Sequence, residues 1–272
     1  MNLMEIKGPK DFHMHTTYCD GKNSAEEMVL AAIDGGLKAV GISGHVYTSF
    51  DERYCMSLEN IVKYHDEIRA LAEKYKDKID VYCGIEQDYF SDYPMDKWDY
   101  VIGSVHYIRV PAKGPDAPRA DLLGQELGYY EVDGWAYIPV DDGAEILEAA
   151  AERYFDGDIY ALTAEYFNTM SKVAEDIKPN IIGHFDLVCK FNDKYAVFDE
   201  NDPRYVAAWK SAADKLLESG VPFEINTGAI SRGYKTDPYP SKPIREYIAG
   251  KGGKFIWSSD SHSDKTLCFG FE

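Results

Sequence analysis

The sequence is poor in paired cysteines and in long apolar runs. Five cysteines occur in 272 residues, an odd number without a C-x-x-C pair, so neither a disulfide framework nor a zinc finger is indicated. This cysteine usage fits a reducing compartment. No apolar stretch approaches the roughly 18 residues needed to span a membrane, and the N-terminus lacks the basic flank and apolar run of a signal peptide. We therefore expect a soluble, cytoplasmic protein with no membrane partner.

Basic residues are also scarce relative to acidic ones. The chain has 29 Lys and Arg residues against 47 Asp and Glu residues, which gives a net charge of −18 at pH 7. A field of this sign repels nucleic acids and anionic lipid surfaces, so we expect no nucleic-acid partner. The simplest interpretation is an acidic, solubilising surface, which leaves room for one local positive site. Hydrophobic residues make up 45% and charged residues 28%, as in globular proteins, which excludes wholesale disorder.

Short β-rich runs alternate with amphipathic helical patterns along the chain. The helix after Ser24 has the clearest boundaries, because Glu27 completes a capping box and Gly35 and Gly36 provide a stop. The alternation predicts an α/β fold with a parallel sheet or barrel. The predicted strands lie near 10–13, 38–43, 80–86, 99–105, 180–184, 221–226 and 253–259. Further helices are predicted at 57–76, 144–155, 159–177, 203–219 and 241–250.

The stretch at about 109–143 interrupts this alternation. It is rich in Pro and Gly, carries several aromatic residues, and is too long for an ordinary connection between a strand and a helix. We interpret it as an insertion. A lid over a site and a decoration without function are equally open interpretations.

Histidines gather where the predicted strands end. Six of the 7 histidines lie at or just beyond the C-terminal end of a strand, and only His65 lies within a helix. His13 and His15 point to the same side, because side chains alternate along an extended chain, and Asp260 and His262 repeat that spacing. A parallel sheet or barrel places its site at these strand ends. With the nearby carboxylates, the candidate metal ligands are His13, His15, Asp20, His45, Glu86, His106, His184, Asp260 and His262.

This set of candidate ligands exceeds the needs of one ion. A catalytic zinc ion takes about three or four protein ligands and keeps one open position, so the set predicts more than one ion with a carboxylate between them. Mixed imidazole and carboxylate ligation fits Zn, Mn or Fe better than Ca. Three divalent ions would bring a charge of about +6 and three carboxylates about −3, which leaves a site of local positive charge in an acidic protein. Its natural occupant is an anion such as a phosphate group.

The ordered motifs HMH, GISGH, GIE with GSVHY, GHFD and SDSH, between Asp11 and Phe271, resemble those of the PHP (polymerase and histidinol phosphatase) superfamily. Within it, the sequence most resembles the histidinol-phosphate phosphatases. The supporting features are SVHYI followed by an acidic insertion ending in VDD, then GHFDLVCKF, and then EINTGAISRG with YPS soon after. The resemblance implies one distorted (β/α)7 barrel of the PHP type over residues 1–272, with a site for two to three divalent ions at the C-terminal ends of the strands.

The resemblance also implies how the metal ligands are shared. Some relatives have histidine where Asp20 stands. A carboxylate at this position would give the third site a harder donor set, in the sense of hard and soft metal ligands. The first ion would be held by His13, His15, Glu86 and Asp260, the second by Glu86, His106 and His184, and the third by Asp20, His45 and His262.

The implied reaction is hydrolysis of L-histidinol phosphate to L-histidinol and phosphate, with attack by a hydroxide that bridges the metal ions. Glu86 would be shared between ions during catalysis, and Asp260 or His262 would help a proton to reach the leaving alkoxide. Arg232 resembles the family's phosphate-binding arginine, because its fork suits a phosphate. Lys190 is a second phosphate candidate. The alternative interpretation of both residues is a solvated loop cation.

The insertion is expected to recognise the rest of the substrate. The imidazole and ammonium groups of histidinol need aromatic and acidic partners. Two further carboxylates near strand ends, Asp186 and Glu224, are assigned no role beyond orienting ligands. The candidate partners in the insertion are Tyr129, Tyr130, Glu131, Asp133, Trp135, Asp141 and Asp142.

Two other functions stay open. The same metal site could hydrolyse another ester, such as phosphotyrosine, a nucleotide or a further small phosphate ester, or the barrel could bind a phosphorylated ligand without turnover. The sequence ends at CFGFE soon after its last motif, whereas relatives usually continue into a final helix. The missing helix predicts an exposed apolar stripe and therefore association, for example as a homo-oligomer.

Overall fold

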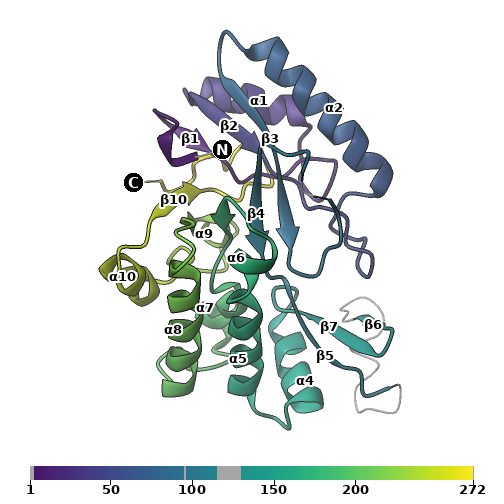
Figure 1. The fold of residues 1–272 in the computed structure, drawn as a ribbon, viewed down its shortest axis with the longest axis vertical. Helices are drawn as coiled ribbons and strands as arrows, with labels where there is room; N and C mark the ends of the chain where they lie inside the picture. Colours follow the sequence, from purple (N-terminus) through teal and green to yellow (C-terminus); the bar gives the residue numbers. More distant parts are fainter. Residues whose placement is uncertain (1–2, 95, 115–129, 272) are drawn as a thin grey trace.

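The computed structural model describes residues 3–94, 96–114 and 130–271. Seven parallel strands form one sheet in the order β1-β2-β3-β4-β8-β9-β10, whose outer strands come from the two ends of the chain (Figure 1). Each of the seven lies where the sequence predicts a strand. Their bounds are β1 Lys10–Asp11, β2 Ala39–Ile42, β3 Asp80–Asp88, β4 Tyr100–Ser104, β8 Ile181–Ile182, β9 Phe223–Asn226 and β10 Phe255–Ser258.

The two outer strands approach each other and nearly close the sheet into a barrel. Met14, just after β1, pairs in parallel with Ser261, just after β10. The N–H of His15 donates to the carbonyl oxygen of Ser261 at 2.8 Å, and the N–H of Ser261 donates to the carbonyl oxygen of His13 at 3.2 Å. The predicted distorted barrel is therefore confirmed. Its closure brings the first and last predicted metal ligands side by side.

Helices flank the sheet (Figure 1). The predicted capping box of α1 is present, since Ser24 accepts from the N–H of Glu27 and the Glu27 carboxylate accepts from the N–H of Ser24. The predicted helix 159–177 is instead split into α5 and α6, where the Ser171 hydroxyl donates to the carbonyl oxygen of Asn168 at 2.8 Å. The main helices are α1 Ala25–Asp34, α2 Leu58–Tyr75, α4 Ala144–Tyr154, α5 Ile159–Met170, α6 Val173–Asp176, α8 Pro203–Leu217 and α10 Lys242–Gly250. Short segments are η1 Leu3–Glu5, η2 Leu187–Cys189, α7 Asn192–Tyr195 and α9 Gly228–Ser231.

A second, antiparallel sheet occupies the region of the predicted insertion, in the order β5-β7-β6. The sequence analysis did not predict these strands. Asp133 and Gly134 join β6 to β7 with φ values of 51° and 79°. Such left-handed values are typical of an Asp-Gly hairpin, so this dipeptide is the sequence signal that reveals the sheet. The strands are β5 Tyr107–Pro111, β6 Tyr130–Val132 and β7 Trp135–Pro139.

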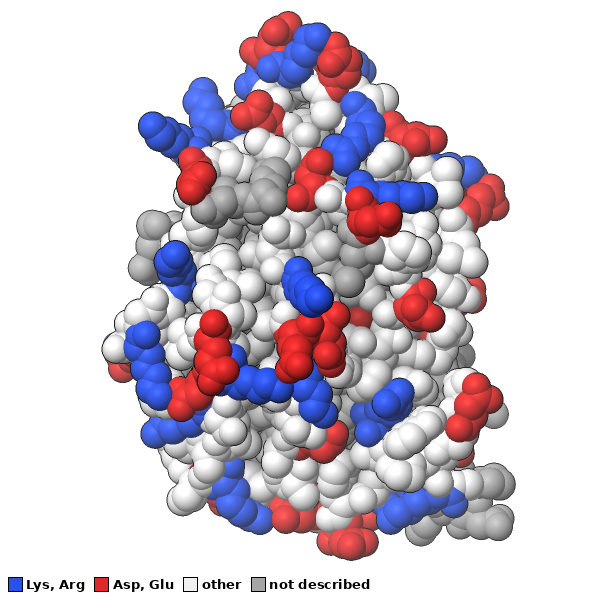
Figure 2. Space-filling model, viewed as in Figure 1, with Lys and Arg blue, Asp and Glu red and all other residues white. Residues whose placement is uncertain are grey.

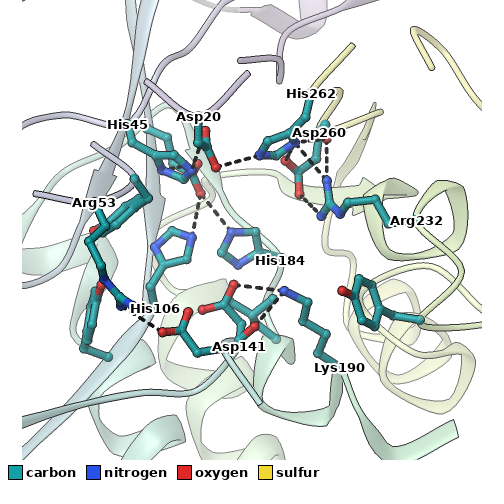
Figure 3. Close-up of a pocket in the computed structure, with 16 residues that line it drawn as sticks. Asp20, His45, Arg53, His106, Asp141, His184, Lys190, Arg232, Asp260 and His262 are labelled. Carbon is teal, nitrogen blue, oxygen red and sulfur yellow. Dashed lines mark hydrogen bonds and ion pairs between the residues drawn. The ribbon is translucent and has the colours of Figure 1, made fainter. Parts of the chain in front are cut away.

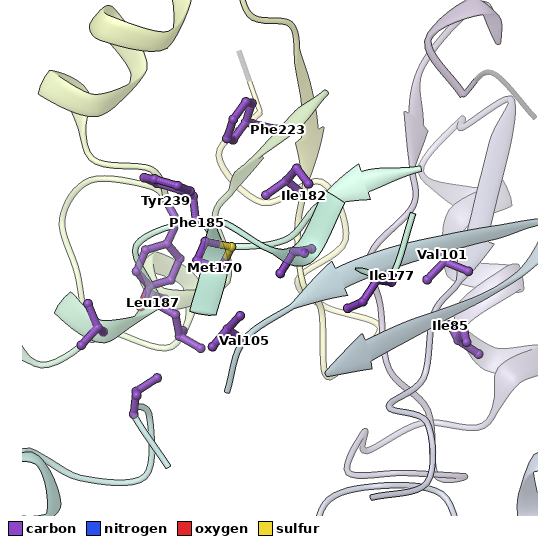
Figure 4. Packing of buried hydrophobic residues seen from close by; sticks show 14 of the residues in the cluster. Ile85, Val101, Val105, Met170, Ile177, Ile182, Phe185, Leu187, Phe223 and Tyr239 are labelled. Atoms are coloured by element: carbon purple, nitrogen blue, oxygen red, sulfur yellow. The ribbon is translucent and has the colours of Figure 1, made fainter. Parts of the chain in front are cut away.

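Apolar side chains of the strands and helices form the main core, in which Phe185 and Phe223 meet edge to face (Figure 4). A smaller cluster contains Phe12 and Tyr100, and the Tyr100 hydroxyl donates to the carbonyl oxygen of Phe12 at 2.7 Å. The Tyr100 ring lies so close to Gly84 that a Cβ there would be 2.2 Å from its Cζ. Glycine is therefore required two residues before Glu86, a predicted metal ligand.

The surface mixes charges of both signs, as Figure 2 shows for one face. Acidic and basic side chains are interspersed there, and that face shows no single basic stripe. In the part of the chain that the structure describes, no helix is both long and apolar enough to cross a bilayer.

Candidate metal centre

All nine predicted metal ligands converge at the C-terminal ends of the barrel strands. Figure 3 labels Asp20, His45, His106, His184, Asp260 and His262 among them. The side chains of His13 and His15 are fully buried, whereas that of Asp20 is 32% exposed. The ligands therefore extend from the barrel interior to the rim of the site. By element, His13 and His15 follow β1, Asp20 precedes α1, His45 follows β2, Glu86 lies in β3, His106 follows β4, His184 follows β8, and Asp260 and His262 follow β10.

The carboxylate of Glu86 lies at the centre of the cluster. Its Oε1 accepts a hydrogen bond from the hydroxyl of Ser104 at 2.6 Å, which fixes its orientation. The same oxygen lies 2.8 Å from Nε2 of His184 and 3.4 Å from Nε2 of His106. The other oxygen, Oε2, faces three more imidazoles, at 3.2 Å from His13 Nε2, 3.6 Å from His15 Nε2 and 3.0 Å from His45 Nδ1.

Asp260 brings a second carboxylate against the first two histidines. Its Oδ1 lies 3.2 Å from Nε2 of His15 and 3.7 Å from Nε2 of His13. Its Oδ2 accepts from Nη2 of Arg232 at 3.1 Å. Asp260 adopts a φ of 49°, a left-handed value that is uncommon for a residue with a side chain. Such backbone strain clusters at functional sites, where it aims a side chain.

Asp20 completes a third group at the rim. Its Oδ2 lies 3.1 Å from Nε2 of His262, and its Oδ1 lies 3.7 Å from Nδ1 of His15 and 3.8 Å from Nε2 of His45. The ring of His15 stacks against those of His45 and His262, with centroids 4.3 and 4.2 Å apart. His15 thus faces both this group and the pair formed by Glu86 and Asp260.

The donor atoms fall into three groups whose members all lie within 4.8 Å of one another. The predicted assignment gave His15 to the first ion and His45 to the third, whereas in the structure each of these rings faces two groups. The groups are His13, His15 and Asp260; His45, Glu86 and His106; and His15, Asp20, His45 and His262. His184 belongs to none of the three groups, but its Nε2 contacts Glu86, a member of the second one.

These residues fit divalent metal ions. Within the described residues, the buried atoms His13 Nε2, His15 Nε2 and Glu86 Oε2 have no hydrogen-bond partner. Buried polar atoms rarely stay unpaired, and each specific exception needs an explanation such as an ion. The unpaired atoms are imidazole nitrogens and a carboxylate oxygen that face one another, which is the donor chemistry of zinc and related metals.

At two ligands, Glu86 and His15, the electrostatics favour the charge states that metal binding requires. Burial raises the pKa of Glu86, but the surrounding His13, His45 and His106 outweigh it and hold this pKa well below its ordinary value. Burial, together with the neighbouring His262 and His45, lowers the pKa of His15 to about 3. Glu86 is therefore ionised and His15 neutral near pH 7, as metal ligands must be. At four other rings burial lowers the pKa, but neighbouring carboxylates outweigh it and raise the pKa, so these rings would release a proton on binding a metal ion: His13, His45, His106 and His184.

A cavity of about 410 Å³ opens beside the cluster. Figure 3 shows Arg232 next to Asp260 and His262, with Lys190 and Asp141 on another wall. Nζ of Lys190 donates to the carbonyl oxygen of Asp141 at 2.8 Å and lies 3.2 Å from its Oδ2. Both predicted phosphate-binding cations, Arg232 and Lys190, thus line the same cavity as the metal ligands.

The predicted substrate partners in the insertion divide into two groups. Asp141 and Asp142 line the cavity. Glu131 instead accepts from Arg153 and from the Tyr154 hydroxyl, at 3.0 and 2.9 Å. Trp135 packs against the guanidinium of Arg109, and Asp133 lies in the β6–β7 turn. Tyr129 is outside the described residues, and the side chain of Tyr130 is likewise not described.

Sequence reasoning missed several residues of the cavity wall. Arg53 donates to Asp142 at 2.9 Å and forms an ion pair with the buried Asp51 at 2.8 Å. The ring of Tyr54 lies against that of His45, with centroids 4.8 Å apart. Asp51, Arg53 and Tyr54 all lie in the loop between β2 and α2, a few residues after His45. Their position after a ligand-bearing strand is the signal that could have found them.

The fold and the site together define an α/β barrel with a multi-donor metal centre at its strand ends. The chain belongs to the PHP domain family, whose model matches residues 11–228. It is similar to the "Probable histidinol-phosphatase" of Deinococcus radiodurans, with 26% identity over 277 aligned residues that cover 98% of this chain and 91% of that protein.

Two solved structures share this fold. The HisK protein of Listeria monocytogenes superposes with a TM-score of 0.74 at 19% identity, over 96% of this chain and 98% of that one. The histidinol phosphate phosphatase of Lactococcus lactis, solved with Zn, L-histidinol and phosphate, gives a TM-score of 0.60 at 21% identity, over 94% of this chain and 87% of that one. Both agree with the barrel described above.

Proposed function

We propose that this chain is a metal-dependent phosphomonoesterase that hydrolyses L-histidinol phosphate to L-histidinol and phosphate. The observation that carries the proposal is a single cavity lined by imidazoles and carboxylates, by a cation beside them, Arg232, and by a separate carboxylate, Asp141. The name of the Deinococcus relative supports the reaction. The Zn, L-histidinol and phosphate bound by the Lactococcus protein support the pairing of a metal centre with this substrate.

The nine donors would hold two to three divalent ions, Zn²⁺, Mn²⁺ or Fe²⁺. Such ions supply electrophilic stabilisation of phosphate charge and lower the pKa of water. The chain's own contribution is to place Glu86 among five imidazoles, so that one carboxylate serves more than one ion. Burial of this carboxylate, whose side chain is 1% exposed, keeps water away from the donors.

Arg232 would bind the phosphate group. Its guanidinium is a rigid fork of donors that matches phosphate oxygens, and it lines the cavity beside Asp260 and His262. Asp260 holds the fork at the edge of the donor cluster, so the arginine needs little reorganisation to meet an anion there. This placement would bind the substrate and orient its phosphorus toward the metal ligands.

His262 is the donor best placed to pass a proton to the leaving alkoxide. Its side chain is 21% exposed, against 10% for His106 and 2% for His184. Asp260, the other candidate, is 8% exposed and is held by Arg232. A ring at the boundary between the donors and the open cavity can exchange a proton with both substrate and solvent.

Asp141 would recognise the cationic tail of the substrate. Lys190 donates to the carbonyl oxygen of Asp141 and to its Oδ2, which holds this residue in place on the cavity wall. An ammonium or imidazole donor would find a charged acceptor here, on a different wall of the cavity from Arg232 (Figure 3). Because Lys190 already donates to Asp141, we propose Arg232 as the principal phosphate ligand and Lys190 as a subsidiary one.

The deciding experiment is phosphate release from L-histidinol phosphate by Zn- or Mn-loaded protein, with p-nitrophenyl phosphate measured alongside. We expect a kcat/KM of about 10⁴ M⁻¹s⁻¹ or more for L-histidinol phosphate, well above that for the aryl ester. Turnover of the aryl ester alone would contradict the substrate and favour another small phosphate ester. Phosphate binding without turnover of either ester would favour a binding module.

The wider setting is proposed from the sequence. The net charge of −18 supports a small-molecule substrate rather than a nucleic acid. We propose a cytoplasmic enzyme of histidine biosynthesis. A homo-oligomer remains a prediction, which light scattering coupled to size-exclusion chromatography would check.

A further inference from the structure

Among the seven barrel strands, β9 differs in the residues that it brings to the site. None of the nine predicted metal ligands lies on β9 or on the described turn that follows it. Instead β9 carries Glu224 and Asn226, two residues apart and therefore on the same face of the strand. Both side chains are completely buried. A buried carboxylate beside a buried amide is costly unless each group is hydrogen-bonded, so their partners indicate what they do.

Glu224 joins two metal ligands from different strands. Its Oε2 lies 2.8 Å from Nδ1 of His13, so the ring donates from Nδ1 and presents Nε2 to the metal cluster. That Nε2 faces Glu86 Oε2 at 3.2 Å and Asp260 Oδ1 at 3.7 Å. The other oxygen of Glu224 accepts from the backbone N–H of His184. One carboxylate thus sets the tautomer of His13 and the position of His184.

Asn226 extends the contact to a third ligand. Its Nδ2 donates to Glu224 Oε1 at 2.8 Å and lies 3.3 Å from Oδ2 of Asp260. Its Oδ1 accepts from the N–H of Gly228 at 2.8 Å, which fixes which end of the amide faces the carboxylates. The amide therefore bridges two carboxylates that would otherwise repel each other.

We propose that Glu224 and Asn226, which are not among the nine proposed metal ligands, act as a positioning pair that orients His13, His184 and Asp260 for metal binding. The pair spans ligands that follow β1, β8 and β10, on both sides of β9 in the barrel. This inference rests on the proposed metal centre but not on the identity of the substrate. Carboxylates that accept from a ligating histidine fix its ring and raise its basicity, and their loss weakens metal binding about 10- to 100-fold.

The substitution Glu224→Gln separates positioning from simple packing, because it keeps the size of the side chain. Glu224 accepts hydrogen bonds at both oxygens and donates none. A glutamine must turn its NH₂ group toward one of these donors. Facing His13, the amide forces the proton of the ring onto Nε2, where it blocks a metal ion. When the NH₂ group instead faces His184 and Asn226, it meets two N–H donors and no acceptor.

The test measures Zn²⁺ affinity by competition with a chromophoric chelator, together with the visible absorption of the Co²⁺-loaded protein. For Glu224→Gln we expect Zn²⁺ binding about 10- to 100-fold weaker than in the unmodified chain, with altered Co²⁺ bands. The matched control is Asp186→Asn, which alters another fully buried carboxylate whose side chain accepts from the N–H of Ser241 and from the Cys189 thiol. This control should keep Zn²⁺ affinity within about threefold of the unmodified chain.

A purely structural role for Glu224 would give a different pattern. The metal-free variant would then melt at a lower temperature, while Zn²⁺ affinity and the Co²⁺ spectrum stayed unchanged, and that result would overturn the inference. If Glu224→Gln does not fold, Asn226→Ala serves instead, with an expected loss of Zn²⁺ affinity of about three- to tenfold. An unmodified chain that binds no Zn²⁺ would refute the proposed metal centre as well as this inference.

Discussion

Nη1 of Arg232 lies 2.9 Å from Nδ1 of His262 and 2.8 Å from the carbonyl oxygen of Asp260. Arginine can only donate, so Nδ1 of His262 accepts, and the proton of the neutral ring lies on Nε2, which faces Asp20 at 3.1 Å. If Nε2 is used to bind a metal ion, the proton lies on Nδ1 and can be donated to the Asp260 carbonyl, 3.0 Å away. Metal binding would therefore end the contact between Arg232 and His262 and leave one more N–H of the guanidinium for phosphate, while Asp260 still holds the fork.

Substitution of this arginine should weaken substrate binding. For Arg232→Ala we expect the KM for L-histidinol phosphate and for p-nitrophenyl phosphate to rise at least about tenfold, because a charged hydrogen-bonded contact to phosphate is lost. Arg232→Lys should recover part of this loss, since lysine keeps the charge but not the fork. Steady-state kinetics on both esters provide the measurement. An unchanged kcat/KM in the alanine variant would remove Arg232 from the phosphate site.

Neutralisation of Asp141 should affect only a substrate with a cationic tail. We expect Asp141→Asn to raise the KM for L-histidinol phosphate about tenfold, since a charge-assisted hydrogen bond is replaced by a neutral one. The KM for p-nitrophenyl phosphate, which has no cation, should stay the same or fall, because Lys190 loses its acidic partner. The ratio of the two kcat/KM values is the measurement. Equal losses on both esters would show that Asp141 supports the fold rather than substrate choice.

Asp186 should make stability depend on pH. Burial raises the pKa of Asp186 to about 6 despite the opposing effect of Lys235. The folded state thus favours the protonated acid, and this contribution is fully present below an unfolded pKa of about 3.9 and lost as the pH rises through about 6. Asp186→Asn stays neutral at every pH. Relative to the unmodified chain, its free energy of unfolding should therefore rise by about 2 kcal/mol between pH 4 and pH 8.

Urea unfolding of both proteins in EDTA, at the two pH values, would measure this difference without any contribution from metal binding. A gap between variant and unmodified chain that is the same at pH 4 and pH 8 would mean that the Asp186 carboxyl titrates normally in the folded protein.

Metal removal should lower the thermal stability. An ion that binds only the folded state stabilises it by about 2.7 kcal/mol at a free concentration of 100 times its Kd. For a chain of this size, that corresponds to a Tm increase of about 5 °C or more. Calorimetry with EDTA, and again after addition of Zn²⁺, gives the comparison. A Tm that is insensitive to both treatments would contradict the fit between the donor cluster and a metal ion.

The sequence allowed the convergence of the candidate metal ligands to be predicted because their signal is local. A histidine or carboxylate at the end of a predicted strand has its position set by the strand itself, as at His45, Glu86 and His106. Which donors face one another could not be read in this way. Asp20 and His262 are 242 positions apart and meet only because the barrel closes.

The cavity wall was less predictable for the same reason. Arg53 and Asp142 are 89 positions apart, and their contact joins the loop after β2 to the turn after β7. Arg53 belongs to no motif, and the VDD motif that ends at Asp142 gives no sign of its partner, so only the folded arrangement identifies the pair. The break between α5 and α6 was missed because the side chain of Ser171 competes for backbone hydrogen bonds within an otherwise helical pattern.

The pairing of Met14 with Ser261 has a consequence for the synthesis of the protein. Ligands at both ends of the chain share one group, since His13, His15 and Asp260 lie together. A ribosome-bound chain that has not yet released its last strand therefore lacks Asp260 and His262 and cannot complete the site. Under the proposed function, the complete metal site would therefore form only after β10 and the residues that follow it have been synthesised, and a chain that stops before Asp260 would lack it.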